Sequence, residues 1–432
     1  MLASAVLAEA AFPVPHGQPA HGTLRVPGSK SFTNRYLNLA LLARCPLLVE
    51  NLLVAEDPGI FLAALEALGF SIERNRNHVR LSPGPEPARA RIDCGMSGTM
   101  LRFLVAALAA RPGEWVLDGA PRLRERPVGP LVAALSELGA EIEFLSKPGF
   151  VPLRIHGRRL RGGAVDLDAS ESSQYLSALL MAALLAEGEV EVRAAALTSE
   201  PYVGITLEAI AAFGGRVSSP EPRRFVVEPG LSPPGGVVVE GDYSSACYWA
   251  AAAALTGGRV FLPGLSPDSP QGDRRFFELL QAMGAVVSWG EESVEVSGTG
   301  RLTALEADLS DIPDQVPTLA ALAPFAHGTT RITGVPHLRL KESDRLAALA
   351  GELNRLGATV EEHDDGLTVH GTWAEGGVPT GPVEVKTHGD HRIAMSLAVL
   401  GLRRPGVSIA NPEVVAKSYP GFWRHLVSLL PT

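Results

Sequence analysis

Several short polar segments of the chain combine residue types that bind anions and transfer protons. The first is PGSKSFTNR, residues 27–35, which places glycine, two serines and Lys30 ahead of the apolar stretch RYLNLALLA, and that stretch begins with Arg35. A helix that begins here would present free backbone N–H groups and the positive end of its dipole to an anion. A nucleotide-binding loop is a poor alternative, because the lysine follows a serine and Thr23 occupies the position that requires glycine.

Polar residues followed by an alanine- and leucine-rich helix recur six times along the chain. The six segments contain Ser31, Gly98, Ser173, Ser245, Asp314 and Asp390, and they recur about every 72 residues. Between them lie amphipathic stretches that end in a glycine and lead into a short strand, with the glycines at Gly69, Gly139, Gly214, Gly284 and Gly357. A glycine in this place is typical of a left-handed helix C-cap. We therefore predict six units of strand, polar segment, helix, strand, helix and one or two strands, the last closing with FWRHLVSLL.

Helices that alternate with strands in this way predict an α/β layered protein. A chain of 432 residues is long enough for two or three domains. If the six helix starts converge, their side chains would form a site for a pair of small anionic substrates.

Composition narrows the class of protein. A net charge of -9 argues against a general nucleic-acid binder, and the apolar runs, such as ACYWAAAAAL, are about half as long as a membrane span. The N-terminal MLASAVLAEAAFPVP lacks a basic leader, so we expect a tail or a first strand and not a signal peptide. Cys45, Cys94 and Cys247 are too few and too scattered for a disulfide framework or a zinc site. We expect a cytoplasmic protein that binds neither membranes nor nucleic acid and needs no metal or cofactor.

The candidate residues in the first half of the chain each have a plain structural alternative. Arg122, Arg124 and Arg126 in GAPRLRERPVG form either an anion clamp or a solvated charged turn. The serines before Gln174 and the one in LTSEPYVG are either ligands or helix N-caps.

The same holds for the second half. In HLRLKESDRL the offsets of Lys341, Glu342 and Arg345 are helical, which allows a ligand-binding face or a surface ion-pair network. His391, between Asp390 and Arg392, is either a site residue or a capping or core histidine.

Together these segments resemble the 5-enolpyruvylshikimate-3-phosphate synthases of the enolpyruvyl transferase family. The resemblance covers essentially the whole chain, in family order, through VPGSKSFTNR, GMSGTMLRFL, DGAPRLRERPVGPL, SSQYLSALLMAA, EGDYSSACYW, DIPDQVPTLA, LKESDRL, DHRIAMS and AKSYPGFW. It implies an inverse α/β barrel-like fold of two domains, each of three βαβαββ units around a pseudo-threefold axis. We expect one domain in residues 1–28 and 243–432, the other in residues 29–242, and the active site in the cleft between them.

The resemblance also implies a reaction and a set of residues. The enolpyruvyl group of phosphoenolpyruvate moves to the 5-hydroxyl of shikimate 3-phosphate, releasing phosphate, in the pathway to aromatic amino acids that glyphosate inhibits. Asp314 matches the base near the 5-hydroxyl, Glu342 matches the proton donor to C3, and Lys30 lies close to both substrates. The positions that match the phosphoenolpyruvate site are Lys30, Gly98, Arg126, Gln174, Arg345, Arg392 and Lys417. Those that match the shikimate 3-phosphate site are Lys30, Ser31, Arg35, Ser172, Ser173, Gln174, Ser199, Asp314, His337 and Lys341. We expect a monomer.

Two positions depart from the family pattern. Met96 stands where the family usually has asparagine, which removes a polar contact beside Gly98. His337 stands where asparagine is common, and a histidine there would change charge with pH. We expect the affinity for shikimate 3-phosphate to weaken as the pH rises through the histidine range.

Two alternative functions stay open. The first is the sister enzyme that transfers enolpyruvyl to a UDP-amino sugar, but the loop DGAPRLRERP lacks the reactive cysteine typical of those relatives. The second is a catalytically inactive binding protein of the same fold, which the presence of Lys30, Asp314 and Glu342 argues against.

Overall fold

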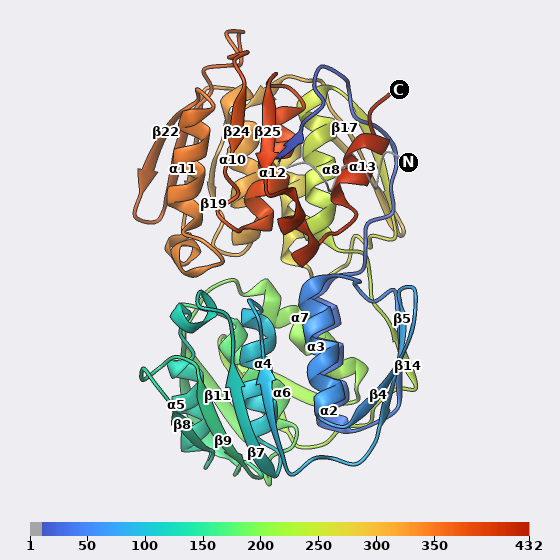
Figure 1. Ribbon diagram of the computed structural model, residues 1–432, viewed down its shortest axis with the longest axis vertical. Coiled ribbons are helices and arrows are strands. Elements are labelled where there is room, and N and C mark those ends of the chain that lie inside the picture. Colours follow the sequence, from blue (N-terminus) through green and yellow to red (C-terminus); the bar gives the residue numbers. More distant parts are fainter. Residues whose placement is uncertain (1–10, 432) are drawn as a thin grey trace. The chain divides into compact units, whose positions relative to one another are not determined.

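A computed structural model describes residues 11–431, which fold into two compact units. Unit 1 is formed by the chain up to Pro27 and from Glu240 onward, and unit 2 is Gly28–Val239 (Figure 1). Most of the apolar N-terminal stretch lies outside the described residues, and the expected first strand is present where the description begins, as β1 (Ala11–Pro13).

Unit 2 repeats one βαβαββ plan three times. In the second and third repeats the first two strands are parallel, with a helix between them, and a second helix leads into an antiparallel hairpin that pairs with the second strand. The first repeat has the same sheet, but its first strand comes from the end of the unit. The strands are β3 (Leu47–Glu50), β4 (Phe70–Asn75), β5 (His78–Pro83), β6 (Arg89–Asp93), β7 (Gly113–Asp118), β8 (Glu141–Phe144), β9 (Leu153–Gly157), β10 (Gly163–Ala169), β11 (Val190–Leu197), β12 (Arg216–Glu221), β13 (Arg224–Glu228) and β14 (Gly236–Val238). The helices are α2 (Lys30–Ala43), α3 (Glu56–Ala67), α4 (Gly98–Ala109), η2 (Leu123–Glu125), α5 (Gly129–Glu137), α6 (Gln174–Ala183) and α7 (Pro201–Ala212).

Unit 1 follows the same plan, with its third sheet reduced to β1-β25-β24. Its strands are β1, β2 (His21–Thr23), β15 (Arg259–Pro263), β16 (Val286–Gly290), β17 (Ser293–Ser297), β18 (Leu302–Thr303), β19 (Glu306–Asp308), β20 (Ala326–His327), β21 (Thr329–Thr333), β22 (Thr359–His363), β23 (Gly366–His370), β24 (Val383–Val385) and β25 (Val407–Ala410). Its helices are α8 (Tyr243–Thr256), η3 (Gly272–Arg274), α9 (Arg275–Ala282), η4 (Pro313–Gln315), α10 (Val316–Leu322), η5 (Ala323–Phe325), η6 (Pro336–Leu340), α11 (Arg345–Arg355), α12 (His391–Gly401), η7 (Pro412–Lys417) and α13 (Phe422–Ser428).

Two strands pair with strands that lie far from them in the sequence. Strand β2 precedes α2 along the chain, yet it lies parallel to β15, with His21 opposite Arg259. Strand β14 precedes α8, yet it lies parallel to β3. The first repeat of each unit is therefore completed by a strand from a distant part of the sequence, and the chain crosses between the units at these two places.

The five repeated glycines end helices as expected. Each lies two residues beyond the last helical residue of α3, α5, α7, α9 or α11, with a φ between +68° and +102°. Only glycine adopts this left-handed conformation without a steric cost from Cβ, which explains why the same residue recurs at the same place.

Three alanine-rich helices form the centre of each unit. In unit 2 these are α2, α4 and α6, and in unit 1 they are α8, α10 and α12, and within each unit they pack against one another. They are mostly apolar and almost wholly buried, as expected for helices enclosed by other elements. The polar segments found in the sequence lie at the N-terminal ends of these central helices.

Candidate active site

Arg345 organises the charged residues of unit 1. It is the first residue of α11, and its side chain is 1% exposed. Its guanidinium group donates to three carboxylates, with 2.8 Å from Nη1 to Asp314 Oδ1, 3.0 Å from Nη2 to Glu342 Oε2, and 2.7 Å from Nε to Asp390 Oδ2. Burial lowers the pKa of Arg345, but the charges of Asp390, Glu342 and Asp314 outweigh this effect and raise the pKa above its ordinary value. We call Arg345 and these three carboxylates the Arg345 cluster.

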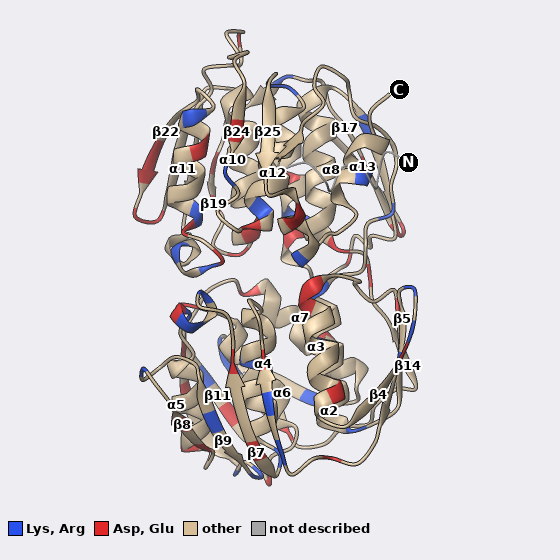
Figure 2. Ribbon diagram, in the orientation of Figure 1, with Lys and Arg blue, Asp and Glu red and all other residues tan. Residues whose placement is uncertain are grey.

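Two further cations complete the arrangement. Arg392, in the first turn of α12, donates from Nη2 to Asp314 Oδ2 at 2.6 Å, and Lys417 Nζ lies 3.1 Å from Glu342 Oε1. Both cations are buried, with 6% of each side chain exposed. Of the three carboxylates, Asp390 is fully buried, whereas 21% of Asp314 and 11% of Glu342 is exposed. Asp314 and Glu342 are therefore the acidic groups of the cluster that a bound molecule can reach. Figure 2 shows acidic and basic ribbon segments close together at the same end of unit 1, below the label of α12.

The helix expected around Lys341 is absent. Lys341 and Glu342 lie in a bend, and α11 begins only at Arg345, because Asp344 caps it by accepting from the Ala347 N–H at 3.1 Å. The contact between Glu342 and Arg345 exists, but it spans the start of the helix. The surface ion-pair alternative is wrong for these two residues, since both side chains are largely buried.

His337 also differs from the expectation. It lies in η6, 6% exposed, and its Nε2 has no hydrogen-bond partner among the described residues. Burial and the nearby Lys341 charge lower the pKa of His337 to about 3. A pKa near 3 makes the ring neutral in the ordinary histidine range, so the change of charge expected there is not found, whereas the pH dependence of the affinity for shikimate 3-phosphate stays a prediction. A neutral imidazole can still donate one hydrogen bond to an anion.

Asp273, a buried carboxylate in η3, is not among the residues predicted from the sequence. Its Oδ2 accepts from Gln315 Nε2 at 2.9 Å and from the Ser244 hydroxyl, while its Oδ1 has no partner among the described residues. Burial, together with the Asp314 charge, raises the pKa of Asp273 to about 6. Asp273 thus ties η4, which carries Asp314, to the first turn of α8.

Asp273→Asn is expected to change how stability depends on pH. The folded carboxyl binds a proton below about pH 6 and the unfolded one only below about pH 4, so the unfolding free energy of the parent falls as the pH rises between these values. Relative to Asp273→Asn, the parent should lose about 2–3 kcal/mol between pH 4 and pH 7. Urea denaturation at four pH values measures this, with exposed Asp268→Asn as the control. Parallel curves for the parent and Asp273→Asn would show that the carboxyl does not titrate in this window.

In unit 2, the first turns of the central helices are linked by hydrogen bonds. Gln174, the first residue of α6, accepts from Arg102 Nη1 at 2.6 Å and donates to Thr99 Oγ1 of α4 at 2.9 Å. Arg102 is buried and also donates to the Pro127 carbonyl. The sequence does contain a signal for Arg102, because it is the lone charged residue in the apolar stretch of α4.

Lys30 and Arg35 of α2 have different environments. Lys30 Nζ lies 3.6 Å from Asp57 at the start of α3, and its side chain is 19% exposed. Arg35 is 2% exposed and donates to Thr206 Oγ1 and to the Ser31 and Tyr202 carbonyls. Burial lowers the pKa of Arg35 to about 9. The structure thus leaves Lys30 accessible, whereas Arg35 connects α2 to α7.

The arginine-rich loop of unit 2 separates into two kinds of residue. Arg122 pairs with Glu125, and Arg124 makes two hydrogen bonds to Asp118, so both belong to local ion pairs, as in the charged-turn alternative. Arg126 is buried and lies over Gly98, where an added Cβ would come within 2.6 Å of its Cζ. Arg126 is therefore the member of the loop that reaches the N-terminus of α4.

The predicted serines are mostly buried beside the same helices. Ser172 Oγ accepts from the Gln174 N–H at 3.3 Å, which supports a capping role, whereas Ser173 precedes α6 without a side-chain cap. Ser199 is buried just before α7 in a left-handed conformation, with a φ of +54°. Ser31, in the first turn of α2, is partly exposed.

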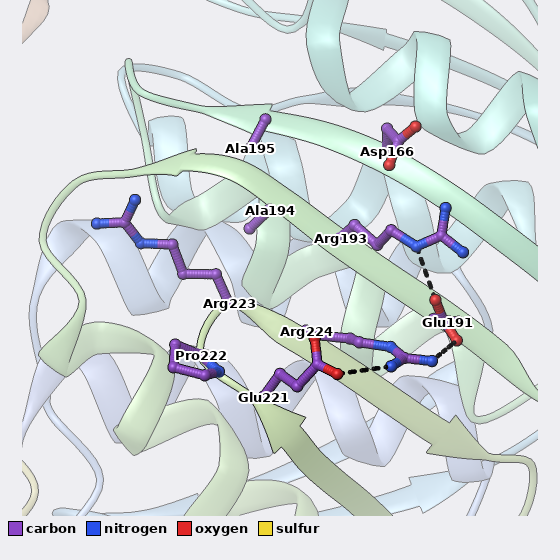
Figure 3. Close-up of a pocket in the computed structure, with 9 residues that line it drawn as sticks. All are labelled: Asp166, Glu191, Arg193, Ala194, Ala195, Glu221, Pro222, Arg223 and Arg224. Atoms are coloured by element: carbon purple, nitrogen blue, oxygen red, sulfur yellow. Dashed lines mark hydrogen bonds and ion pairs between the residues drawn. The ribbon is translucent and has the colours of Figure 1, made fainter.

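A hollow of about 460 Å³ on the outer side of the sheet of β10 to β13 contains none of the predicted residues (Figure 3). Two of its arginines, Arg193 and Arg224, pair with Glu191, and Arg224 also pairs with Glu221. The hollow contains three arginines and three carboxylates, so it lacks the excess positive charge that an anion site requires.

Residues 11–431 were also searched for metal sites and membrane-spanning helices. In this part of the chain no group of three or more His, Cys, Asp or Glu side chains could hold a metal, and none of its helices has the length and hydrophobicity to cross a bilayer. Cys45, Cys94 and Cys247 are free thiols and all are buried.

Comparison with known proteins places these features in a family. A model of the EPSP synthase (3-phosphoshikimate 1-carboxyvinyltransferase) family matches residues 14–426. The chain is 46% identical to the 3-phosphoshikimate 1-carboxyvinyltransferase of Syntrophobacter fumaroxidans, over 93% of this chain and 95% of the relative. It is 44% identical to that of Methanoculleus marisnigri, over 94% of this chain and 96% of the relative.

Solved structures of related proteins are similar to this chain over nearly its whole length. An EPSP synthase from Acinetobacter baumannii is similar with a TM-score of 0.81 and 30% identity, covering 97% of this chain and 98% of that one. The enolpyruvyl transferase NikO from Streptomyces tendae is 20% identical with a TM-score of 0.79, covering 96% of each chain, and shares the fold. The expected fold class, an inverse α/β barrel-like fold of βαβαββ units, is confirmed. The chain therefore belongs to the EPSP synthase (3-phosphoshikimate 1-carboxyvinyltransferase) family.

Proposed function

We propose that the chain transfers the enolpyruvyl group of phosphoenolpyruvate to the 5-hydroxyl of shikimate 3-phosphate, giving 5-enolpyruvylshikimate 3-phosphate and phosphate. The observation that carries this proposal is the Arg345 cluster, in which two accessible carboxylates lie between buried cations. Two acid–base groups and a set of cations are what this reaction needs.

Each carboxylate transfers one of the two protons that move in the reaction. Glu342 gives a proton to C3 of phosphoenolpyruvate, which makes C2 electrophilic. Asp314 accepts the proton of the 5-hydroxyl as O5 forms a bond to C2. The tetrahedral adduct then returns a proton from C3 to the Glu342 carboxylate, the C2–O bond to phosphate breaks, and the enol ether double bond forms.

The charge of Lys417 influences the protonation of Glu342. In the described structure Lys417 lies 3.1 Å from Glu342, so its charge favours the ionised carboxylate. A phosphate or carboxylate group that binds Lys417 competes with Glu342 for this cation, and Glu342 then takes up a proton more readily. Binding of the anionic substrate thus creates the acid that protonates it.

We propose that both units contribute to binding and act as the two domains of the enzyme. In unit 1, Arg345, Arg392 and Lys417 bind phosphoenolpyruvate, and His337 and Lys341 bind shikimate 3-phosphate. In unit 2, phosphoenolpyruvate is bound by Gly98, Arg126 and Gln174, while shikimate 3-phosphate is bound by Ser31, Arg35, Ser172, Ser173, Gln174 and Ser199. Lys30 contacts both substrates. The hydrogen bonds that fix Gln174 and the position of Arg126 over Gly98 support these roles.

Phosphate release from phosphoenolpyruvate tests the proposal. We expect release with shikimate 3-phosphate as acceptor and none with UDP-N-acetylglucosamine. Release only with the sugar nucleotide would assign the chain to the sister activity, and release with neither acceptor would indicate an inactive binding protein.

The proposal also covers the location and the oligomeric state of the enzyme. We propose that the enzyme acts in the cytoplasm as a monomer, which its three free thiols support as far as the compartment is concerned. Cell fractionation and light scattering of the purified protein test location and mass.

A further inference from the structure

We propose that Glu352 and His388 are positioning residues, which hold the loop before α12 so that Arg392 meets the substrate. This inference rests on the proposed function, because Arg392 is one of the residues assigned to phosphoenolpyruvate. Neither Glu352 nor His388 belongs to the Arg345 cluster.

Glu352 is a buried carboxylate that faces this loop. It is 3% exposed, in the middle of α11, and its Oε2 accepts from the Lys386 backbone N–H at 3.1 Å. Its Oε1 lies 3.1 Å from His388 Nε2, and Arg355 of the same helix pairs with Oε2. One carboxylate therefore binds the loop at two points, once through the backbone and once through a side chain.

The same face of α11 also binds the far end of the loop. Arg345 and Glu352 are seven residues apart, about two turns of helix, so both project from one side. Arg345 binds Asp390, the N-cap of α12, and Glu352 binds the chain two and four residues before it. Residues 386–390 are thus attached to α11 at both ends.

The backbone of the loop needs this support. His388 has a φ of +53° and Gly389 a φ of +69°, so two consecutive residues are left-handed. A histidine in this region is strained, and such a conformation persists only where the surroundings impose it. The contact with Glu352 is the side-chain interaction that holds His388 there.

The loop leads directly to reacting groups. Asp390 accepts from the Arg392 backbone N–H at 2.9 Å, and the Arg392 side chain donates to Asp314. Release of His388 would leave the fold of α12 intact, since its helix is buried, but would loosen the turn that aims Arg392.

His388→Gly separates positioning from folding. Glycine adopts the left-handed conformation without strain, so we expect an unchanged or higher urea midpoint. Loss of the Glu352 contact should raise the KM for phosphoenolpyruvate about fivefold, change kcat less than twofold, and speed hydrogen exchange in residues 386–392 about fivefold. The amide nitrogen of His388→Gln reaches as far as His Nε2. This variant should therefore restore the KM and the exchange rate to within twofold of the parent. Glu352→Gln, which cannot accept both hydrogen bonds, should raise KM as His388→Gly does.

The possible outcomes are distinct. Parent-like KM and exchange in His388→Gly, or equal defects in His388→Gly and His388→Gln, would overturn the positioning role. If the parent protein itself releases no phosphate, the proposed function fails, and hydrogen exchange alone decides whether Glu352 and His388 hold the loop.

Discussion

Asp314→Asn and Glu342→Gln are each expected to lower kcat by about 10²- to 10⁴-fold, the usual contribution of a general acid or base. The amides keep the size of the carboxylates and can still accept hydrogen bonds from Arg345, but they cannot exchange a proton at neutral pH. Binding of shikimate 3-phosphate should weaken much less than turnover, by about threefold or less. Phosphate release measures the first quantity and calorimetry the second.

The same pair of variants tests which carboxylate handles which proton. In D2O the parent should incorporate deuterium at C3 of the enolpyruvyl group, because C3 passes through a methyl group in the adduct. Glu342→Gln should abolish this incorporation. Asp364→Asn, an exposed carboxylate outside the Arg345 cluster, is the matched control and should behave like the parent. Near-parent turnover in either Asp314→Asn or Glu342→Gln would remove that residue from the mechanism.

Local signals made the repeats predictable from the sequence. The C-cap glycines were visible because left-handed backbone has a strong residue preference, and Gly69 and its four equivalents all adopt it. The starts of the central helices were visible for a similar reason, since a change from polar to continuous apolar residues marks the entry of a buried helix. These observations locate most of the candidate residues without any tertiary information.

Pairing over long distances was not predictable in this way. The parallel pairs of β2 with β15 and of β14 with β3 join strands that the sequence places in other repeats, and hydrophobic alternation does not specify a partner. For the same reason Asp273 and Glu352 were missed: each is a charged residue whose importance comes from burial against a distant segment.

His337 shows a further limit. From its type alone the residue was expected to titrate near neutral pH, but a solvent-excluded position beside Lys341 favours the neutral ring. Sequence supplies the intrinsic pKa of a side chain, whereas the environment that shifts the pKa exists only after folding.

Arg345→Met is expected to destabilise the protein by about 3–5 kcal/mol, the range found when one partner of a buried ion pair is removed. Methionine fills much of the volume of the arginine side chain, so the loss arises from charge rather than from a cavity. Asp390 would be left fully buried without the guanidinium group that lies 2.7 Å away, and Asp314 and Glu342 would each lose one of their cations. Urea denaturation at pH 7 measures the difference.

A surface arginine provides the control for this substitution. Arg274→Met removes an exposed cation at the end of η3 that pairs with the exposed Glu278 of α9 at 3.8 Å, and it should cost about 1 kcal/mol or less. The loss of stability in Arg345→Met depends on ionised carboxylates. The difference in unfolding free energy between Arg345→Met and the parent should therefore narrow as the pH falls toward 4. Equal losses in the two variants, or a gap that does not change with pH, would mean that Arg345 stabilises unit 1 by packing and not by holding three carboxylates together.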